Sequence, residues 1–341
     1  MNSRRRVNST VRWLRPRVGK TPDFNLQLSR MLSAPQSSQR CIQPERVEPT
    51  KPSSGEMGFT AIHVESGRRI GMKASERFPM ASAYKFPIAV HLLMLVDEGR
   101  VELDHLIRME PKDVRPGGVP LTDNFEFGES SVSVRKLLEM MLTVSDNTAS
   151  DLILRLAGGP HVVTARMRAL GIEDMSIDRS TIEHIFDMFG LPLPPETDWG
   201  PGRYVSLLTS VPANKQRAAT KQYARDSRDT STPDAMASLL VQVWGKNLLK
   251  PETAKLLVGI MRRCQTGEAR LKGLLPAGTE VAHKTGTAMG IVNDVGVITL
   301  PNGAGHIAIV VFIKGSKSLA AESEHSIAEV ARRAYDHFFP N

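Results

Sequence analysis

The chain has 341 residues, and 41% of them are hydrophobic, which is enough for one large domain or two modest domains with real cores. No apolar run reaches membrane-spanning length, so no membrane span is expected. The net charge of +8 is uneven: ten basic and three acidic residues give residues 1–50 a charge of +7, which leaves +1 for the rest. The charge thus belongs to the N-terminal segment, and nucleic acid is not an expected partner.

Residues 1–54 are rich in Arg, Ser and Pro and lack steady periodicity, which predicts a basic, disordered tail. Three arginines at positions 4–6 resemble the start of an export signal. No apolar stretch of suitable length follows them, so a signal peptide is not recognisable. The two cysteines, Cys41 and Cys264, do not form a disulfide framework, and no Cys/His cluster has metal-ligand spacing. The sequence therefore predicts no metal and no cofactor.

The next segment predicts a hairpin followed by a buried helix. Residues 57–64 and 69–73 flank a turn signal, Glu65-Ser66-Gly67, as in an antiparallel hairpin. Residues 88–96 are almost all apolar and lack glycine, which favours a buried helix over a strand. Pro79 suits the start of this helix.

The middle of the chain predicts helices and one long loop. The helices cover residues 133–141, 151–156, 161–170, 233–245 and 251–264. Residues 174–232 are rich in Pro, Gly, Asp and Thr and predict an extended loop, and a loop of this length inside a compact domain is often functional.

The C-terminal part predicts strands at 279–286, 291–300 and 306–313, and a final helix at 319–338. Strands thus come from both chain ends and helices from the middle. We expect an α+β fold, an α/β/α sandwich whose antiparallel sheet is covered by helices, with a helical subdomain at about 100–245. The tail would end at residue 54 and the folded domain would span 55–341.

Three short motifs occur in order along the chain. Ser82 and Lys85 are three residues apart, so a helix places them on one face, where a lysine of lowered pKa could take the serine proton. Such a pair is expected about once by chance in a chain of this length, so alone it is weak. It is followed by Ser145-Asp146-Asn147 and later by Lys284-Thr285-Gly286 in a predicted strand. Ser145-Asp146-Asn147 is also a good helix N-cap.

Together these motifs and their spacing resemble the penicillin-recognising serine enzymes, and class A β-lactamases in particular. The resemblance covers about residues 57–340. It implies that Ser82 is the acylated nucleophile, that Lys85 is its base, and that Ser145 relays a proton to the leaving nitrogen. The substrate would be a small-molecule β-lactam or a cell-wall peptide.

The resemblance also implies the substrate-binding groups. They are the amide of Asn147, the charge of Lys284, the hydroxyl of Thr285, the open backbone at Gly286, the N–H groups of Ser82 and Thr287 as an oxyanion hole, and the carboxylate-binding guanidinium of Arg270.

The chain departs from this family in the loop that follows Asp178-Arg179. The glutamate that activates the deacylating water would fall at Thr181. Glu183 is our expected replacement, with Asp187 and Glu196 as weaker candidates. Arg179 is expected to pair with Asp229 across the loop base, and the loop is about 35 residues longer than the family expectation.

Several alternatives remain open on the sequence. Loss of the loop glutamate favours a penicillin-binding D,D-peptidase or transpeptidase, or another serine esterase, with slow deacylation. A non-hydrolytic β-lactam sensor is a further alternative. We expect a monomer, and the family's usual compartment is periplasmic or secreted.

Overall fold

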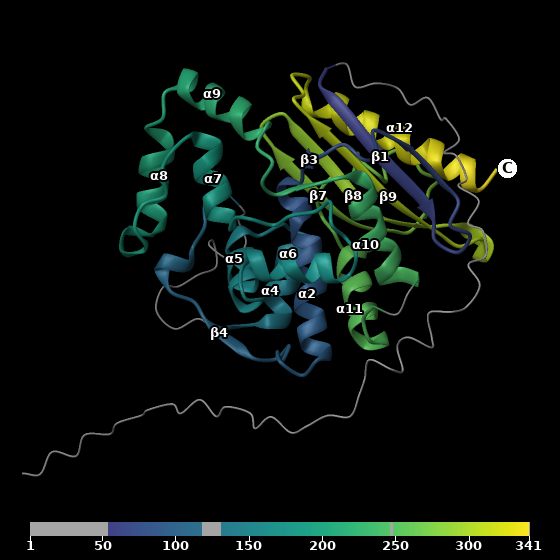
Figure 1. The fold of residues 1–341 in the computed structure, drawn as a ribbon, viewed down its shortest axis with the longest axis horizontal. Helices are drawn as coiled ribbons and strands as arrows, with labels where there is room; N and C mark the ends of the chain where they lie inside the picture. Colours follow the sequence, from purple (N-terminus) through teal and green to yellow (C-terminus); the bar gives the residue numbers. More distant parts are fainter. Residues whose placement is uncertain (1–53, 118–130, 246–247, 341) are drawn as a thin grey trace, which may run out of the picture. The chain divides into compact units, whose positions relative to one another are not determined.

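The structure is a computed structural model that describes residues 54–117, 131–245 and 248–340. Its centre is a five-stranded antiparallel sheet in the order β2-β1-β9-β8-β7. The strands are β1 (Glu56–His63), β2 (Arg69–Met72), β7 (Val281–Ala288), β8 (Ile291–Thr299) and β9 (His306–Lys314). The predicted fold class is confirmed, because strands from both chain ends share one sheet with helices on both faces (Figure 1). The predicted tail lies almost wholly outside the described residues and stays a prediction.

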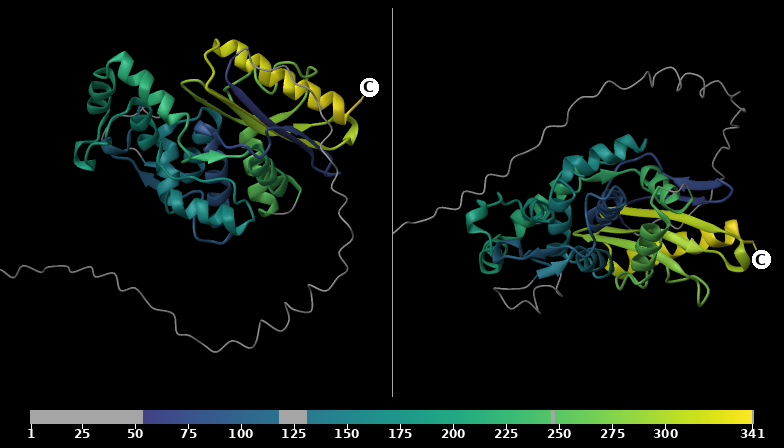
Figure 2. Two further views of the ribbon diagram at one scale, coloured as in Figure 1. Left: turned by 45° about the horizontal axis from the view of Figure 1, so that its top comes forward. Right: turned by 90° about the horizontal axis from the view of Figure 1, so that it is seen from below.

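The sheet is buried on both faces, as the strand sequences require. In β9, Ile307, Ile309, Val311 and Ile313 pack with helix α12 (Ala320–Phe338), and the alternate residues Ala308, Val310 and Phe312 face the other core. Successive side chains of a strand point to opposite faces, so a continuous apolar run can fill two cores at once. Figure 2 shows α12 lying along one face of the sheet and the remaining helices on the other side.

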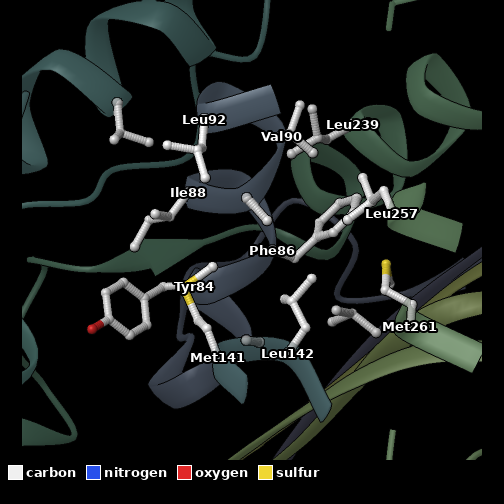
Figure 3. Packing of buried hydrophobic residues seen from close by; sticks show 14 of the residues in the cluster. Tyr84, Phe86, Ile88, Val90, Leu92, Met141, Leu142, Leu239, Leu257 and Met261 are labelled. Carbon is white, nitrogen blue, oxygen red and sulfur yellow. The ribbon is translucent and has the colours of Figure 1, made fainter. Parts of the chain in front are cut away.

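Helix α2 (Lys85–Asp97) is the centre of the larger core, and ten of its thirteen residues are buried. A helix that is apolar on all sides must be surrounded, and α4 (Val134–Thr143), α10 (Pro233–Gly245) and α11 (Pro251–Arg262) pack around it. Figure 3 shows Phe86, Ile88 and Val90 of α2 among residues of those helices. A short 3₁₀ helix, η1 (Ala81–Tyr84), leads into α2, so Ser82 lies one turn before the α-helix begins.

Two further helices of the middle segment begin at residues that favour a helix N-terminus. Helix α5 (Asn147–Leu156) starts earlier than predicted because the Asp146 side chain accepts a hydrogen bond from the Ala149 N–H at 2.7 Å. Helix α6 (Pro160–Ala169) begins with proline at its first position. Two-stranded pairs join β3 (Phe78–Pro79) with β6 (Thr230–Ser231) and β4 (Leu106–Arg108) with β5 (Ser131–Ser133). Short 3₁₀ turns η2, η3 and η4 cover Pro111–Asp113, Glu196–Asp198 and Pro301–Gly303.

The prediction of an extended loop at 174–232 is wrong for most of its length. The segment contains helices α7 (Thr181–Phe189), α8 (Pro201–Thr209) and α9 (Ala213–Tyr223). Ile182, Phe186 and Tyr204 form a small apolar cluster of their own within this segment. The helices are short and separated by Pro and Gly residues, so the helical periodicity of their apolar residues was not recognisable in the sequence. None of the helices in the described part of the chain is long and apolar enough to cross a membrane.

Candidate active site

Ser82 lies in the second position of η1, between strand β3 and helix α2. The preceding residue, Ala81, has a φ of +44°, a conformation that L-residues rarely adopt. Backbone strain of this kind is held only where the surroundings enforce it, and it is concentrated at functional sites. The turn thus presents Ser82 into a cavity, which it lines together with Thr287 and Asn147.

Strand β7 lies directly against the Ser82 turn because Gly286 has no side chain. A Cβ atom at Gly286 would stand 2.4 Å from the Met80 carbonyl oxygen and 3.3 Å from the Ser82 nitrogen. The sequence predicted that Gly286 leaves room for substrate. In the structure, the space beside Gly286 is occupied by the backbone of the turn that carries Ser82. This close approach puts Thr287 and Ser82 on the wall of one cavity. Their N–H groups are the predicted oxyanion hole.

Lys85 is fully buried, and its amino group is hydrogen-bonded to the Ser145-Asp146-Asn147 segment. Its Nζ donates to the Ser145 carbonyl oxygen at 2.7 Å, to the Asn147 Oδ1 at 2.9 Å and to the Ser145 Oγ at 3.2 Å. Burial, reinforced by the charge of Lys284, lowers the pKa of Lys85 well below its usual value. A lysine of lowered pKa can be neutral and accept a proton.

Ser145 joins the two lysines of the site. Its Oγ also accepts a hydrogen bond from the Nζ of Lys284 at 3.0 Å. Ser145 has a φ of +61°, a second non-glycine residue in a strained conformation at this site. The helix-cap interpretation of the Ser145-Asp146-Asn147 motif is confirmed, because Asp146 caps α5. Its two neighbours contact Lys85, and their catalytic roles stay a prediction.

Lys284 is fully buried in β7, beside Thr285. Burial lowers the pKa of Lys284 to about 8, against the opposing charges of Cys264 and Asp294. The Thr285 hydroxyl is bonded to the Thr266 hydroxyl at 2.6 Å. Lys284 thus carries positive charge at neutral pH in a site from which water is largely excluded.

Arg270 is buried behind β7. Its guanidinium donates to the Thr287 Oγ1 at 2.8 Å and to the Asn293 carbonyl oxygen at 2.9 Å, and it pairs with Glu324 at 3.1 Å. In this arrangement Arg270 positions the Thr287 hydroxyl and reaches the cavity through it. Direct contact of Arg270 with a substrate carboxylate stays a prediction.

Helix α7 forms the wall of the cavity opposite the Ser82 turn. Thr181, His184, Ile185 and Met188 line the cavity, and their spacing is that of one helix face. The Asp151 carboxylate accepts from the Thr181 N–H at 2.6 Å and fixes the start of the helix. The space open to water-sized molecules is about 80 Å³.

Glu183 lies on a different face of α7. Its carboxylate accepts from the Ser180 N–H and from the Ser180 hydroxyl, both at 2.7 Å, in a reciprocal capping box. The structure thus does not bring Glu183 to the cavity that Ser82 lines. The two weaker candidates are also engaged elsewhere, because Asp187 pairs with Arg179 and Arg228, and Glu196 lies 3.6 Å from the Lys112 ammonium group.

The predicted pair of Arg179 and Asp229 is present and buried, with 2.6 Å between Nε and Oδ2. Burial works to raise the pKa of Asp229, but the charges of His184 and Arg179 outweigh it and hold this pKa well below its usual range. His184 is the residue that sequence reasoning missed here. Its Nε2 lies 3.3 Å from Asp229 Oδ1, and its Nδ1 is bonded to the Tyr223 hydroxyl at 2.6 Å.

A signal for His184 was present in the sequence. Ser180 and Glu183 have the spacing of a capping box, which predicts a helix beginning at Thr181. With that helix in place, a cavity-facing Thr181 brings His184, three residues on, to the same face and turns Glu183 away.

A second group that the sequence did not reveal lies behind Lys284. His283 and Asp294 are fully buried and 2.9 Å apart, and Asp294 raises the pKa of His283 to about 10 against the effect of burial. Burial works to raise the pKa of Cys264, but the interaction with His283 lowers it to about 7. In the described ranges, no cluster of three or more His, Cys, Asp or Glu residues is arranged to hold a metal ion.

Comparison with known proteins identifies relatives over most of the chain. The profile of the β-lactamase enzyme family matches residues 44–338. Beta-lactamase VEB-1 of Pseudomonas aeruginosa is 32% identical over 270 residues, which cover 76% of this chain and 78% of the relative. Beta-lactamase AST-1 of Nocardia asteroides is 31% identical over 295 residues, which cover 86% of this chain and 82% of the relative.

Solved structures agree with these matches. An ancestral class A β-lactamase is 32% identical, has a TM-score of 0.67, and covers 84% of this chain and 95% of its own. A β-lactamase from Chitinophaga pinensis is 29% identical, has a TM-score of 0.66, and covers 83% of this chain and 94% of its own. The likeness thus extends over most of the chain.

Proposed function

The chain belongs to the β-lactamase enzyme family, and on that premise we propose that it hydrolyses the β-lactam amide through an acyl-enzyme on Ser82. The observation that carries this proposal is the shared Ser145 hydroxyl, which accepts hydrogen bonds from both Lys85 and Lys284 beside the Ser82 cavity. Two buried lysines joined by one serine provide a path for protons and a positive charge for an anionic substrate.

In this proposal, acylation of Ser82 uses Lys85, Ser145, Lys284 and the predicted oxyanion hole. The neutral Lys85 amine takes the Ser82 proton, and the serine oxygen attacks the lactam carbonyl carbon. The carbonyl oxygen becomes negative and is stabilised by the N–H groups of Ser82 and Thr287. The proton then passes through Ser145 to the lactam nitrogen as the ring opens. Positive Lys284 and the Thr285 hydroxyl bind the substrate carboxylate.

The experiment that tests this function follows turnover and intact mass of the purified protein with a chromogenic cephalosporin. We expect steady turnover in the wild type and none in Ser82→Ala. A protein that shows neither turnover nor a mass increase would contradict the proposal.

A D,D-peptidase is a second candidate, because none of the described residues that line the cavity is a carboxylate. An enzyme that lacks a base for the second half-reaction would hold its lactam adduct. A single burst with a stable mass increase on the Ser82 peptide would favour this candidate over the β-lactamase.

A further inference from the structure

The cavity beside Ser82 has to supply a base for water if the acyl-enzyme is to be hydrolysed, and this inference rests on the function proposed above. Among the lining residues that the structure describes, the titratable groups besides the serine are Tyr84, His184 and Tyr223. Imidazole is the one group of these three whose unperturbed pKa lies near neutrality. The space of about 80 Å³ can hold water, since one buried water needs roughly 10–15 Å³.

His184 has a hydrogen-bond partner at Nδ1 and a carboxylate near Nε2, which itself makes no hydrogen bond. One ring nitrogen, Nε2, lies 3.3 Å from Asp229 Oδ1, and the other, Nδ1, is 2.6 Å from the Tyr223 hydroxyl. All three side chains are buried. They come from α7, from the segment before β6 and from the last residue of α9, so the helices of the 174–232 segment assemble the group.

The chemistry of the partners sets the proton positions. Arg179 binds the other oxygen of Asp229 at 2.6 Å, and it lowers the pKa of this carboxylate together with His184, whose effect is the larger when its ring is protonated. Nε2 of His184 lies 3.3 Å from Asp229 Oδ1 without a hydrogen bond. In the neutral ring that the relay uses, the nearby carboxylate favours the proton on Nε2, which leaves Nδ1 as the acceptor. Burial raises the pKa of Tyr223, so its hydroxyl is protonated and donates to Nδ1.

We propose that Asp229, His184 and Tyr223 form the proton relay that activates the hydrolytic water of the Ser82 acyl-enzyme. The Tyr223 hydroxyl is the catalytic group that contacts the water. His184 receives the proton through it and Asp229 stabilises the resulting imidazolium, so both act as positioning residues for the tyrosine.

The step balances in protons and electrons. Water gives one proton to the Tyr223 oxygen as the tyrosine proton moves to His184 Nδ1, and the water oxygen bonds to the acyl carbon. The carbonyl electron pair moves onto its oxygen, which the N–H groups of Ser82 and Thr287 bind. When the intermediate collapses, the bond to the Ser82 oxygen breaks, and the proton held by His184 returns through Tyr223 to that oxygen.

The hydroxyl groups of Tyr84 and Thr181, also on the cavity wall, cannot relay a proton in the same way. The Tyr84 hydroxyl is 2.5 Å from the Thr181 Oγ1, and burial raises the pKa of Tyr84 well above its usual value. Two hydroxyl groups bonded to each other have no acceptor that ionises near neutrality.

Several charged and titratable groups surround His184. The Tyr84 and His184 rings lie 5.0 Å apart, Tyr223 is hydrogen-bonded to Nδ1, Asp229 lies 3.3 Å from Nε2, and Arg179 lies 5.1 Å over the Tyr223 ring. Asp187 and Asp226 face Arg179 from its other side.

The test measures acylation and deacylation separately in His184→Gln and Tyr223→Phe, by stopped-flow kinetics with a chromogenic cephalosporin and by intact mass. General-base groups contribute about 10²–10⁴-fold. We expect deacylation to slow by at least about 10²-fold in both variants, with acylation unchanged and an accumulating adduct. Ser180→Ala is the matched control, because it removes the cap of the same helix without touching the relay.

Three outcomes would overturn the relay. Wild-type deacylation in either variant would exclude it, and so would an equal loss in Ser180→Ala, which would assign the effect to helix stability. Slow deacylation in Glu183→Gln together with normal deacylation in His184→Gln would return the role to the glutamate. Absence of any acylation in the wild type would instead contradict the proposed function itself, so the two failures are distinguishable.

Discussion

A Cβ atom added to Gly286 would lie 2.4 Å from the carbonyl oxygen of Met80, a distance at which one of the two must move. The strand and the turn that carry the two predicted oxyanion-hole N–H groups therefore hold their spacing only while residue 286 is glycine. Loss of one oxyanion-hole donor costs about 10²–10³ in rate. We expect Gly286→Ala to slow acylation of Ser82 by about 10²-fold.

The measurement for this first prediction is the acylation rate from the burst phase with a chromogenic cephalosporin. Gly202→Ala is the control, because Gly202 has no atom within 4 Å of its added Cβ. An unchanged acylation rate in Gly286→Ala would show that this close approach does not set the oxyanion hole.

The second prediction concerns the protonation of Lys85. Burial lowers its pKa, so the acylation rate should fall as pH decreases through that lowered pKa and the amine becomes charged. Arginine cannot be deprotonated, so Lys85→Arg should lose about 10²–10⁴-fold in acylation at all pH values. Lys136→Arg on the exposed face of α4 is the control. Substantial acylation in Lys85→Arg would mean that another group takes the serine proton.

The third prediction concerns the buried pair of Arg179 and Asp229. Arg179→Met removes the guanidinium partner of the buried Asp229 carboxylate, which keeps its backbone N–H donors and the nearby His184. The free energy of unfolding at pH 7 should therefore fall by up to about 3–5 kcal/mol. The pKa of Asp229 is depressed in the folded state, so the pair's contribution is present above pH 3.8 and is lost as pH falls below it. Urea denaturation at pH 7 and pH 3 should therefore show a gap between variant and wild type that narrows at pH 3. A gap that widens in acid would contradict this linkage.

The fourth prediction concerns His283. Its pKa is raised to about 10 by Asp294, so the stability it contributes is full below pH 6.5 and is lost as pH rises towards about 10. NMR should show a protonated His283 ring at pH 8 in the wild type. In Asp294→Asn, burial without a carboxylate should lower the pKa below 6.5, so the ring should be neutral at pH 8. A neutral ring in the wild type at pH 8 would be inconsistent with the ion pair.

The fifth prediction restores a carboxylate to the cavity. Thr181 faces the cavity from the first turn of α7, so Thr181→Glu places an acid beside the Ser82 site, and burial raises its pKa towards the range of a useful base. In the His184→Gln background we expect this change to accelerate deacylation by about 10-fold or more. Thr181→Gln in the same background is the control. Equal deacylation rates for the glutamate and glutamine variants would show that a carboxylate at this position does not reach the water.

Much of the fold followed from local pattern. The apolar run at residues 88–96 predicted a buried helix, and α2 is buried on nearly all sides. The C-terminal strands and the hairpin were predicted to within a few residues. Alternating apolar and polar residues, or continuous apolar runs, predict a strand without knowledge of its tertiary contacts. The helices at 181–223 were missed, because they are short and their apolar residues gather around Tyr204 rather than along one long stripe.

The sequence by itself predicted the residues of acylation, since Ser82, Lys85, Ser145 and Lys284 stand in motifs whose spacing leaves little freedom once the elements form. Only the tertiary structure decided which group on α7 faces the cavity. The helix turns by about 100° per residue, so Glu183 and His184 point in different directions although they are adjacent in the chain. The caps of that helix, Ser180 with Glu183 and Asp151 with Thr181, fix its rotation, and a contact between residues thirty positions apart is not visible in the sequence.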